Sequence, residues 1–164
     1  MSSTAKENIN DFTDVAKIFE KYADMVYRLA FVRTKSESDS DDILQEVFLR
    51  YIKVCSKIES EEHLKAMLLR ITVNCSKSFL TSSWFKKTEP LNDTLSYTDN
   101  VSEGSVLAEV LKLPVKYRTA VHLHYYCGYL VKEIAQIEGI NESTVKTHLI
   151  RARAILKETL KEEI

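Results

Sequence analysis

The stretch GINESTVKTHLIRARAIL, from Gly139 to Leu156, has the pattern of a tight turn followed by a helix. Glycine tolerates the positive backbone angles that end a helix, so Gly139 suits the turn. After the turn, apolar side chains recur at the spacing of one helical face, at Val145, Leu149, Ala152 and Leu156. A short helix is expected before it, over 131–137, with the small residue Ala135 at the crossing. These features predict a helix-turn-helix.

The opposite face of the second helix carries hydroxyl, basic and exposed apolar groups: Ser143, Lys146, Thr147, Ile150 and Arg151. Hydroxyl and basic groups bind phosphates or base edges, and an apolar side chain such as Ile150 can meet a thymine methyl. An amphipathic helical hairpin with a solvated face would show a similar pattern. The glycine turn and the hydroxyl-rich start of the helix favour DNA binding.

The chain has 164 residues and a formal net charge of −1, but this total combines three different segments. Residues 1–87 hold 14 basic and 13 acidic side chains, residues 88–104 hold none and 4, and residues 105–164 hold 9 and 7. The middle segment has Pro90, Gly104 and many small polar residues, without sustained apolar periodicity, which predicts a flexible acidic linker. We therefore expect two small domains, 10–87 and 105–164, joined by the linker 88–104.

The composition indicates an all-α protein, because glycine (3) and proline (2) are scarce while good helix formers are common. Before the linker, apolar periodicity and polar caps predict four helices: 15–29 after Thr13, 43–51 after Asp39 or Ser40, 64–71 after Ser60, and 76–85. No stretch is long and apolar enough to insert into a membrane. Three widely spaced cysteines fit a reducing cytosol, so a cytoplasmic protein is expected.

The segment HLKAMLLRITVNCSKSFLTSSWFKK, 63–87, contains five lysine or arginine residues and no acidic one. Basic side chains follow a phosphate backbone, and the interleaved aromatic residues Phe79, Trp84 and Phe85 can stack on unpaired bases. VNCS, 73–76, is expected to be a polar break between two helices, suited to capturing a flipped base. The alternative, in which the aromatic residues belong to the core, has equal weight on composition alone.

The segment DSDDILQEVFLR, 39–50, places Asp42, Gln45 and Glu46 on one helical face. Three interpretations are open at this point: a solvated acidic face, a docking face for a basic partner, or a magnesium site. A magnesium site would need facing carboxylates from Glu61 or Glu62. Cys127 with His122 and His124 lacks the ligand number and spacing of a zinc site, so no metal or other cofactor is expected.

Taken together, three segments resemble the extracytoplasmic-function group of sigma factors of bacterial RNA polymerase. They are DDILQEVFLRYI, LKAMLLRITVNCSKSFL and LPVKYRTAVHLHYYCGYLVKEIAQIEGINESTVKTHLIRARAIL, in that order, with the linker before the third. The resemblance covers nearly the whole chain. It implies a dissociable subunit without catalysis, which binds core RNA polymerase and promoter DNA and is held by an anti-sigma factor.

The resemblance also implies a role for particular residues. The acidic helix would dock on the polymerase through Asp42, Gln45 and Glu46, with added contacts from Phe48 and Ile52. The segment TVNCSK would bind the promoter −10 element, with Asn74 contacting a base and Val73, Cys75, Ser76 and Lys77 around it. The last helix would bind the −35 element through Ser143, Lys146, Thr147, Ile150 and Arg151.

Two rival functions remain at this point. STVKTHL also resembles the recognition helix of response regulators, so a stand-alone helix-turn-helix regulator is the main alternative. It does not account for the acidic helix, and the N-terminal block lacks the alternating strands of a receiver domain. A metal-dependent helical enzyme centred on Asp42 and Glu46 is the second alternative.

Overall fold

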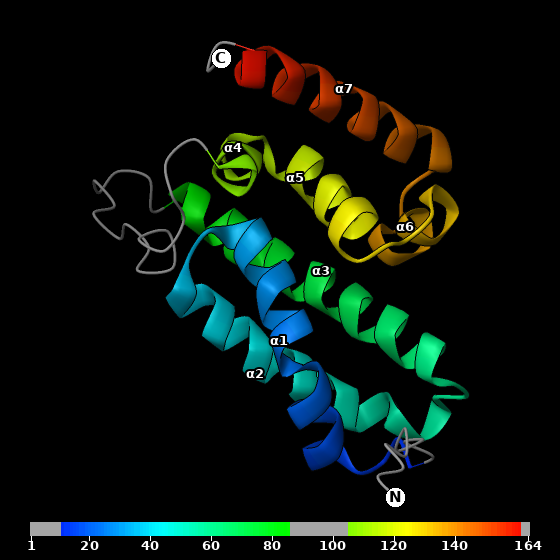
Figure 1. Ribbon diagram of the computed structural model, residues 1–164. Coiled ribbons are helices and arrows are strands. Elements are labelled where there is room, and N and C mark those ends of the chain that lie inside the picture. The colour runs from blue at the N-terminus through cyan, green and yellow to red at the C-terminus, as the bar shows by residue number, and fades with distance from the viewer. Residues whose placement is uncertain (1–10, 86–104, 162–164) are drawn as a thin grey trace, which may run out of the picture.

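A computed structural model describes residues 11–85 and 105–161, and every regular element in these two ranges is helical (Figure 1). The N-terminal unit contains α1 (Val15–Thr34), α2 (Glu37–Val54), a 3₁₀ turn (Cys55–Lys57) and α3 (Glu61–Phe85). The C-terminal unit contains α4 (Val106–Lys112), α5 (Val115–Val121), a π-helical turn (His122–Tyr126), α6 (Val131–Glu138) and α7 (Glu142–Lys161). The expected all-α class is confirmed. The predicted linker, 88–104, lies outside the described residues.

Helices α1, α2 and α3 pack around one apolar core, which includes Ile18, Val26, Ile43, Val47 and Leu68. Two of the helix starts differ from the expected positions. Asp14, not Thr13, caps α1, and Ser36, not Asp39 or Ser40, caps α2 by accepting a hydrogen bond from the Asp39 amide at 3.1 Å. Lys35 is left-handed, with φ 55°, so the connection between the helices is short and α2 begins before its apolar pattern does.

Helix α3 runs without interruption through 73–76, so the expected polar break and the separate helix over 76–85 are wrong. The polar side chains in this part of α3 bond to carbonyls of their own helix. Thr72 donates to the Leu68 carbonyl at 2.7 Å, and Ser76 donates to the Val73 carbonyl at 2.8 Å. Because these bonds satisfy the hydroxyl groups inside the helix, and Leu68 and Val73 are buried on it, nothing forces the chain to open into a loop.

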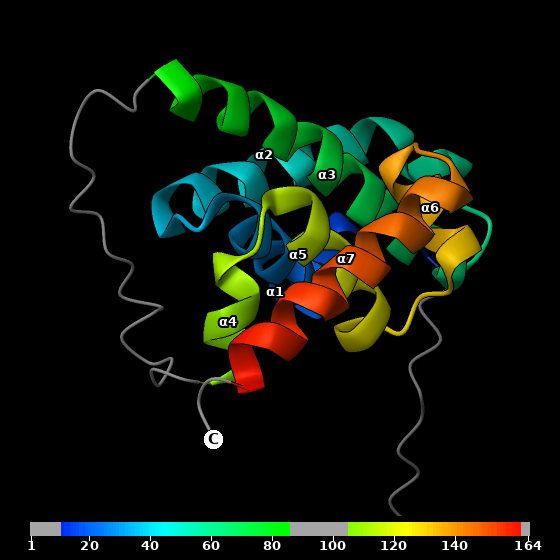
Figure 2. The ribbon, with the colours of Figure 1, turned by 90° about the horizontal axis from the view of Figure 1, so that it is seen from above.

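The predicted helix-turn-helix is present as α6, a turn and α7. Gly139 has φ 70°, and its amide donates to the Ala135 carbonyl at 2.9 Å, which ends α6. Asn141 starts α7 by accepting the amides of Thr144 and Val145 on its carbonyl. Helix α7 then packs across α5 through its buried stripe of Val145, Leu149 and Ala152 (Figure 2). At the N-terminus of α6, the Leu130 amide donates to the Glu133 carboxylate at 3.0 Å.

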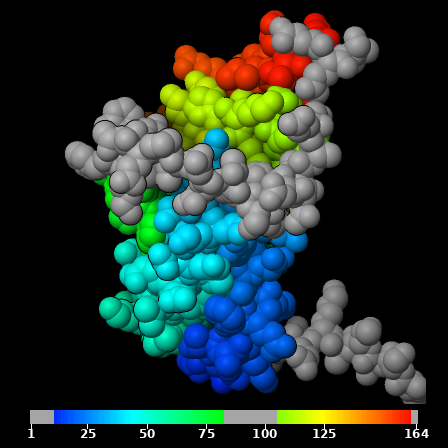
Figure 3. Space-filling view, turned by 90° about the vertical axis from the view of Figure 1, so that its left-hand side faces the viewer, coloured from blue at the N-terminus to red at the C-terminus, as the bar shows by residue number. Residues whose placement is uncertain are grey.

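The two units lie against each other, with α4, α5 and α6 between α7 and the three long helices (Figures 1 and 3). Among the described residues, one apolar cluster crosses the boundary. It joins Leu29, Leu69 and Val73 of the N-terminal unit to residues of α5, the π-helical turn and α6, among them Ala120, Leu123 and Ile134. None of the helices described is long and apolar enough to cross a membrane.

Candidate nucleic-acid interface

Helix α7 presents the five predicted DNA-binding residues together on its outer side. Ser143, Lys146, Thr147, Ile150 and Arg151 are all exposed, and we call them the recognition face. Ile150 is 63% exposed although it is apolar, which leaves its side chain available to a thymine methyl. Arg153 continues this side of α7. It donates to the Tyr125 hydroxyl at 2.5 Å, and its guanidinium lies 5.6 Å from the centre of the Tyr125 ring.

The second candidate surface is an exposed line of side chains along α3. Arg70, Asn74, Lys77 and Thr81 follow each other at helical spacing and are all exposed; we call them the α3 stripe. Of the residues predicted around Asn74, Lys77 is exposed with it, while Val73, Cys75 and Ser76 are buried. Phe79 is half-buried against the N-terminal core, as expected for a core residue. The side chains of Trp84 and Phe85 lie outside the described part.

The predicted docking residues lie along α2. Asp42, Gln45 and Ile52 are exposed, and half-buried Glu46 pairs with Arg50 at 3.0 Å. Leu49 is also exposed beside them, so apolar and acidic groups share one surface. Phe48 is buried, and its ring contacts Phe19 edge-on at 4.9 Å between the ring centres. Phe48 thus supports this surface from below. Phe19, which is 42% exposed, adds an apolar group that the sequence analysis missed.

The interface between the two units contains two buried arginines. Arg118 of α5 donates three hydrogen bonds to backbone carbonyls. The acceptors are Val32, Arg33 and Leu113, and the bonds to Arg33 and Leu113 are each 2.7 Å long. Val32 and Arg33 belong to the last turn of α1, whose carbonyls have no partner within the helix and attract a cation. Arg33 in turn donates to the hydroxyl of Thr119 at 2.9 Å and to that of Ser76 at 2.5 Å. The C-terminal unit therefore supplies the hydrogen-bond donors for the free carbonyls at the C-terminal end of α1.

Glu138, at the end of α6, carries a carboxylate on which the charge of Arg33 acts. Burial raises the pKa of Glu138 to about 7, while Arg33 and Lys77 oppose this shift. Its Oε2 atom is buried and has no hydrogen-bond partner within the described ranges. Burial, followed by the charge of Arg33, lowers the pKa of Arg118 to about 10. Near neutral pH the interface therefore holds two charged guanidinium groups and the buried Glu138 carboxyl, one oxygen of which has no hydrogen-bond partner within the described ranges.

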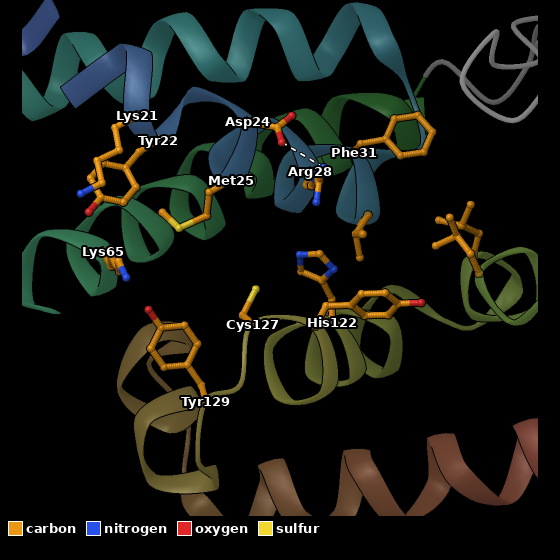
Figure 4. A pocket seen from close by; sticks show the side chains of 14 residues that line it. Lys21, Tyr22, Asp24, Met25, Arg28, Phe31, Lys65, His122, Cys127 and Tyr129 are labelled. Atoms are coloured by element: carbon orange, nitrogen blue, oxygen red, sulfur yellow. Dashed lines mark ion pairs between the residues drawn. The ribbon is translucent and has the colours of Figure 1, made fainter. Parts of the chain in front are cut away.

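A groove of about 540 Å³ runs beside this interface, between α1 and α3 on one side and α4 and the π-helical turn on the other (Figure 4). His122 and Tyr126 line it from the C-terminal unit and stack on each other with ring centres 5.6 Å apart. Arg28 lines the other wall and pairs with Asp24 at 3.0 Å. Burial, with a smaller effect from Arg28, lowers the pKa of His122 to about 4. The groove shows that the two units are not in contact along their whole boundary.

Glu46 and Glu61, two of the carboxylates considered for metal binding, have cationic partners. Glu61 binds the ammonium group of Lys21 at 2.5 Å and also accepts the hydroxyl of Tyr22. No group of three or more histidine, cysteine or acidic residues among those described is arranged to hold a metal ion.

Known proteins resemble both units of the chain. The family model described as Sigma-70 region 2 matches residues 18–85, and the model described as Sigma-70, region 4 matches residues 103–156. RNA polymerase sigma factor SigV of Bacillus subtilis is 32% identical over 143 residues, which are 84% of this chain and 85% of SigV. The chain belongs to the sigma-70 family. ECF RNA polymerase sigma factor SigM of the same organism is 31% identical over 155 residues, which cover 87% of this chain and 93% of SigM.

The chain is therefore a sigma factor of the extracytoplasmic-function group, a transcription initiation factor without catalysis of its own. Solved structures share its fold. Sigma factor RpoE, from a complex with the anti-sigma factor NepR of Bartonella quintana, superposes with a TM-score of 0.71 at 19% identity, over 91% of this chain and 98% of RpoE. CnrH, from a complex with the cytosolic domain of CnrY, gives a TM-score of 0.64 at 18% identity, over 92% of this chain and 89% of CnrH.

Several residues of the interface between the units were missed in the sequence. Arg33, Arg118, Thr119 and Glu138 were not singled out, although Arg33 and Arg118 each lie within a buried run of their helix. One signal in the sequence could have identified them: a charged residue stands where the helical period requires an apolar one. It marks a buried cation, but it does not identify the distant carbonyls that the cation binds.

Proposed function

We propose that three separate surfaces of this sigma factor bind its three partners in transcription initiation. The observation that supports this is their arrangement: the docking residues on α2, the α3 stripe and the recognition face on α7 are exposed on different helices. One chain can therefore contact polymerase and two DNA elements together. The domains follow as 10–87 for docking and the −10 element, and 105–164 for the −35 element. The cytoplasm is the proposed location.

Docking on core polymerase would use Asp42, Gln45, Glu46 and Ile52, with buried Phe48 holding the surface in shape. Exposed apolar groups beside carboxylates are suited to a partner that offers apolar pockets and basic side chains. Because the polymerase then supplies much of the affinity for DNA, the DNA-binding surfaces of this chain can remain small. A formal net charge of −1 is compatible with this division of labour.

The −10 element would be bound as a single strand along the α3 stripe, with Asn74 hydrogen-bonding an unpaired base and Lys77 a phosphate. An amide side chain offers both a donor and an acceptor to a base edge, while the neighbouring cations neutralise the backbone. Val73, Cys75 and Ser76 would shape the helix beneath the strand. On α7, the recognition face would enter the major groove of the −35 element.

We also propose that an anti-sigma factor binds this chain. The support is the shared fold with RpoE and CnrH, whose structures were solved with an anti-sigma factor and with the cytosolic domain of CnrY, respectively. Co-purification of the chain with a protein that suppresses its transcription activity would test this partner.

The decisive experiment is transcription in vitro with purified core polymerase and genomic DNA, followed by mapping of start sites. Start sites that depend on the added chain are expected, and their absence would refute the proposed function. On a promoter found in this way, Asn74→Ala is expected to reduce duplex opening, measured by permanganate reactivity, more than closed-complex formation. Glu59→Ala, an exposed change outside the three surfaces, is the control. An equal loss of both steps would contradict base contact by Asn74.

A further inference from the structure

Arg153 and Tyr125 form an exposed pair that joins α7 to the π-helical turn. The Arg153 Nε atom donates to the Tyr125 hydroxyl at 2.5 Å, and the guanidinium carbon lies 5.6 Å from the centre of the Tyr125 ring. Both side chains are exposed, and Tyr125 is 55% exposed. We propose that Arg153 is a further DNA-contact residue, which binds a backbone phosphate at the edge of the −35 element, and that Tyr125 positions it. The proposal rests on the function assigned above to the recognition face.

The first support is the position of Arg153 around the axis of α7. Ala152 is fully buried in the cluster that joins α7 to α5. Successive residues of a helix are about 100° apart, so Arg151 and Arg153 stand about 100° to either side of Ala152. Ile150, on the recognition face, stands about 160° from Ala152. The two arginines therefore border the recognition face on opposite edges.

A helix in the major groove has one phosphate backbone along each of its edges. The groove is about 12 Å wide and admits a single helix, so residues on the two edges of that helix face the two strands. Lys146 and Lys157 are exposed on the same edge as Arg153, one before it and one after it. When Ile150 faces the bases, Arg153 is therefore directed towards a backbone, where most protein–DNA hydrogen bonds are made.

The second support is that the guanidinium is held with donors to spare. A guanidinium carries several N–H donors, and the bond to Tyr125 uses only the one on Nε. Within the described ranges, none of the ion pairs involves Arg153, so its charge and its Nη donors are available to a phosphate. Arginine binds phosphate through parallel N–H···O bonds, which depend on the orientation of the guanidinium plane. Stacking on Tyr125 sets that plane before DNA arrives.

The third support is the way in which the π-helical turn fixes Tyr125. The Cys127 amide donates to the His122 carbonyl at 3.1 Å, five residues back, which widens the helix at this point. His124 Nδ1 lies 2.9 Å from the Tyr129 carbonyl oxygen, and the His124 ring meets Tyr125 edge-on with ring centres 4.8 Å apart. Turns of this kind are rare and occur frequently at functional sites. Tyr125 is thus held in place although it is exposed.

Arg151, on the other edge of the recognition face, has a comparable partner. As a hydrogen-bond donor, its guanidinium lowers the pKa of Tyr117 of α5, and the Tyr117 ring meets that of His148 edge-on at 5.6 Å between the ring centres. Each edge thus carries an arginine that interacts with a tyrosine from the preceding helical segment. The sequence indicated a DNA contact on one of these edges, and the structure extends it to the other.

Three substitutions separate DNA contact from a purely structural brace between α7 and the π-helical turn. Arg153→Gln removes the charge together with the stacked guanidinium. Tyr125→Phe keeps the ring and the charge of Arg153 but removes the hydroxyl that accepts from Nε. Lys57→Gln, at an exposed position of the N-terminal unit, makes the same change in net charge away from α7 and is the matched control.

The measurement is the affinity of the full chain for a random-sequence DNA duplex over a series of salt concentrations, together with thermal melting of each variant. Arg153→Gln is expected to reduce the log–log salt slope by about 1, because one phosphate contact is lost, while Lys57→Gln keeps the wild-type slope. Tyr125→Phe is expected to keep the slope but to weaken binding about threefold, because the guanidinium then has to be ordered on binding. In the Arg153→Gln background, Tyr125→Phe is expected to change nothing. All melting temperatures should match the wild type, because the substituted side chains are exposed.

A wild-type salt slope for Arg153→Gln would overturn the proposal. Lower melting temperatures of Arg153→Gln and Tyr125→Phe with unchanged DNA affinity would show that the pair is only a brace. Equal effects of Tyr125→Phe with and without Arg153 would remove its positioning role. The random-sequence duplex needs neither promoter nor polymerase. If the wild-type chain supported no promoter-dependent transcription while Arg153→Gln still lowered the slope, the proposed function would fail and the phosphate contact would stand. If transcription were normal but the slope unchanged, only this contact would fail.

Discussion

Glu138 and His122 predict an unusual pH dependence of stability, because burial shifts their pKa values in opposite directions. Burial raises the pKa of Glu138 from 4.5 to about 7 and lowers the pKa of His122 from 6.5 to about 4. Between pH 4.5 and 7 the folded chain holds more protons than the unfolded chain at Glu138, so this residue makes stability fall as pH rises. Between pH 4 and 6.5 the unfolded chain holds more protons at His122, so this residue makes stability rise.

The two effects are similar in size. Each shift of about 2.5 pKa units corresponds to about 3 kcal/mol between the limiting protonation states, of which about 2 kcal/mol falls between pH 5 and 7. In the wild-type chain the two contributions nearly cancel over this range. Glu138→Gln removes the falling contribution, so its free energy of unfolding is expected to rise by about 2 kcal/mol from pH 5 to pH 7 relative to the wild-type profile.

Urea unfolding followed by circular dichroism at several pH values measures this difference. His122→Gln is expected to tilt the profile the other way, with stability falling by about 2 kcal/mol over the same range. The slope is the readout, so a general loss of stability from the substitution of a buried residue does not interfere. Glu158→Gln, which removes one exposed carboxylate of α7, is the matched control. Parallel profiles for wild type and Glu138→Gln would refute the reasoning.

Three further outcomes are expected. Ile52→Asp, at an apolar side chain that is 51% exposed, should weaken binding to core polymerase about tenfold or more in a pull-down titration without lowering the melting temperature; unchanged binding would remove Ile52 from the docking surface. Arg151→Ala should reduce the log–log salt slope of duplex DNA binding by about 1, and an unaltered slope would show that it meets no phosphate. Gly139→Ala should lower the free energy of unfolding by about 1 kcal/mol, because φ is 70° and an added Cβ meets no atom within 4 Å; no loss in thermal melts would show that this turn accepts alanine without strain.

The exposed surfaces on α2 and α7 could be predicted from the sequence because helical periodicity relates residues that are close in the chain. The recognition face on α7 follows from helical periodicity, since fixing Val145 and Leu149 inward puts Lys146 and Ile150 outward. The same logic exposes Asp42, Gln45 and Ile52 on α2. It also buries Phe48, although a docking role had been expected to expose it. The helical period of the segment 43–51 puts Phe48 on the same face as Ile43, Val47 and Tyr51, and the structure buries all four side chains.

The segment around Asn74 shows where local rules were insufficient. Asparagine and serine are poor helix formers, which suggested a break at 73–76. Apolar contacts of Leu68, Leu69 and Val73 on two sides of α3 outweigh that weak preference, and the hydroxyl groups of Thr72 and Ser76 bond within the helix. A break predicted from propensity was therefore overridden by packing.

Most of the helices, the helix-turn-helix and the two units of this sigma factor could be predicted from the sequence, because periodicity and the turn glycine act between residues close in the chain. The way in which the two units meet depends on contacts between residues far apart in the chain. Arg118 is 85 residues from Arg33, whose carbonyl it binds, and the pKa of Glu138 is raised by its burial in the folded chain. Burial and the pairing of distant charges depend on the relative placement of the units, and no local pattern encodes that placement.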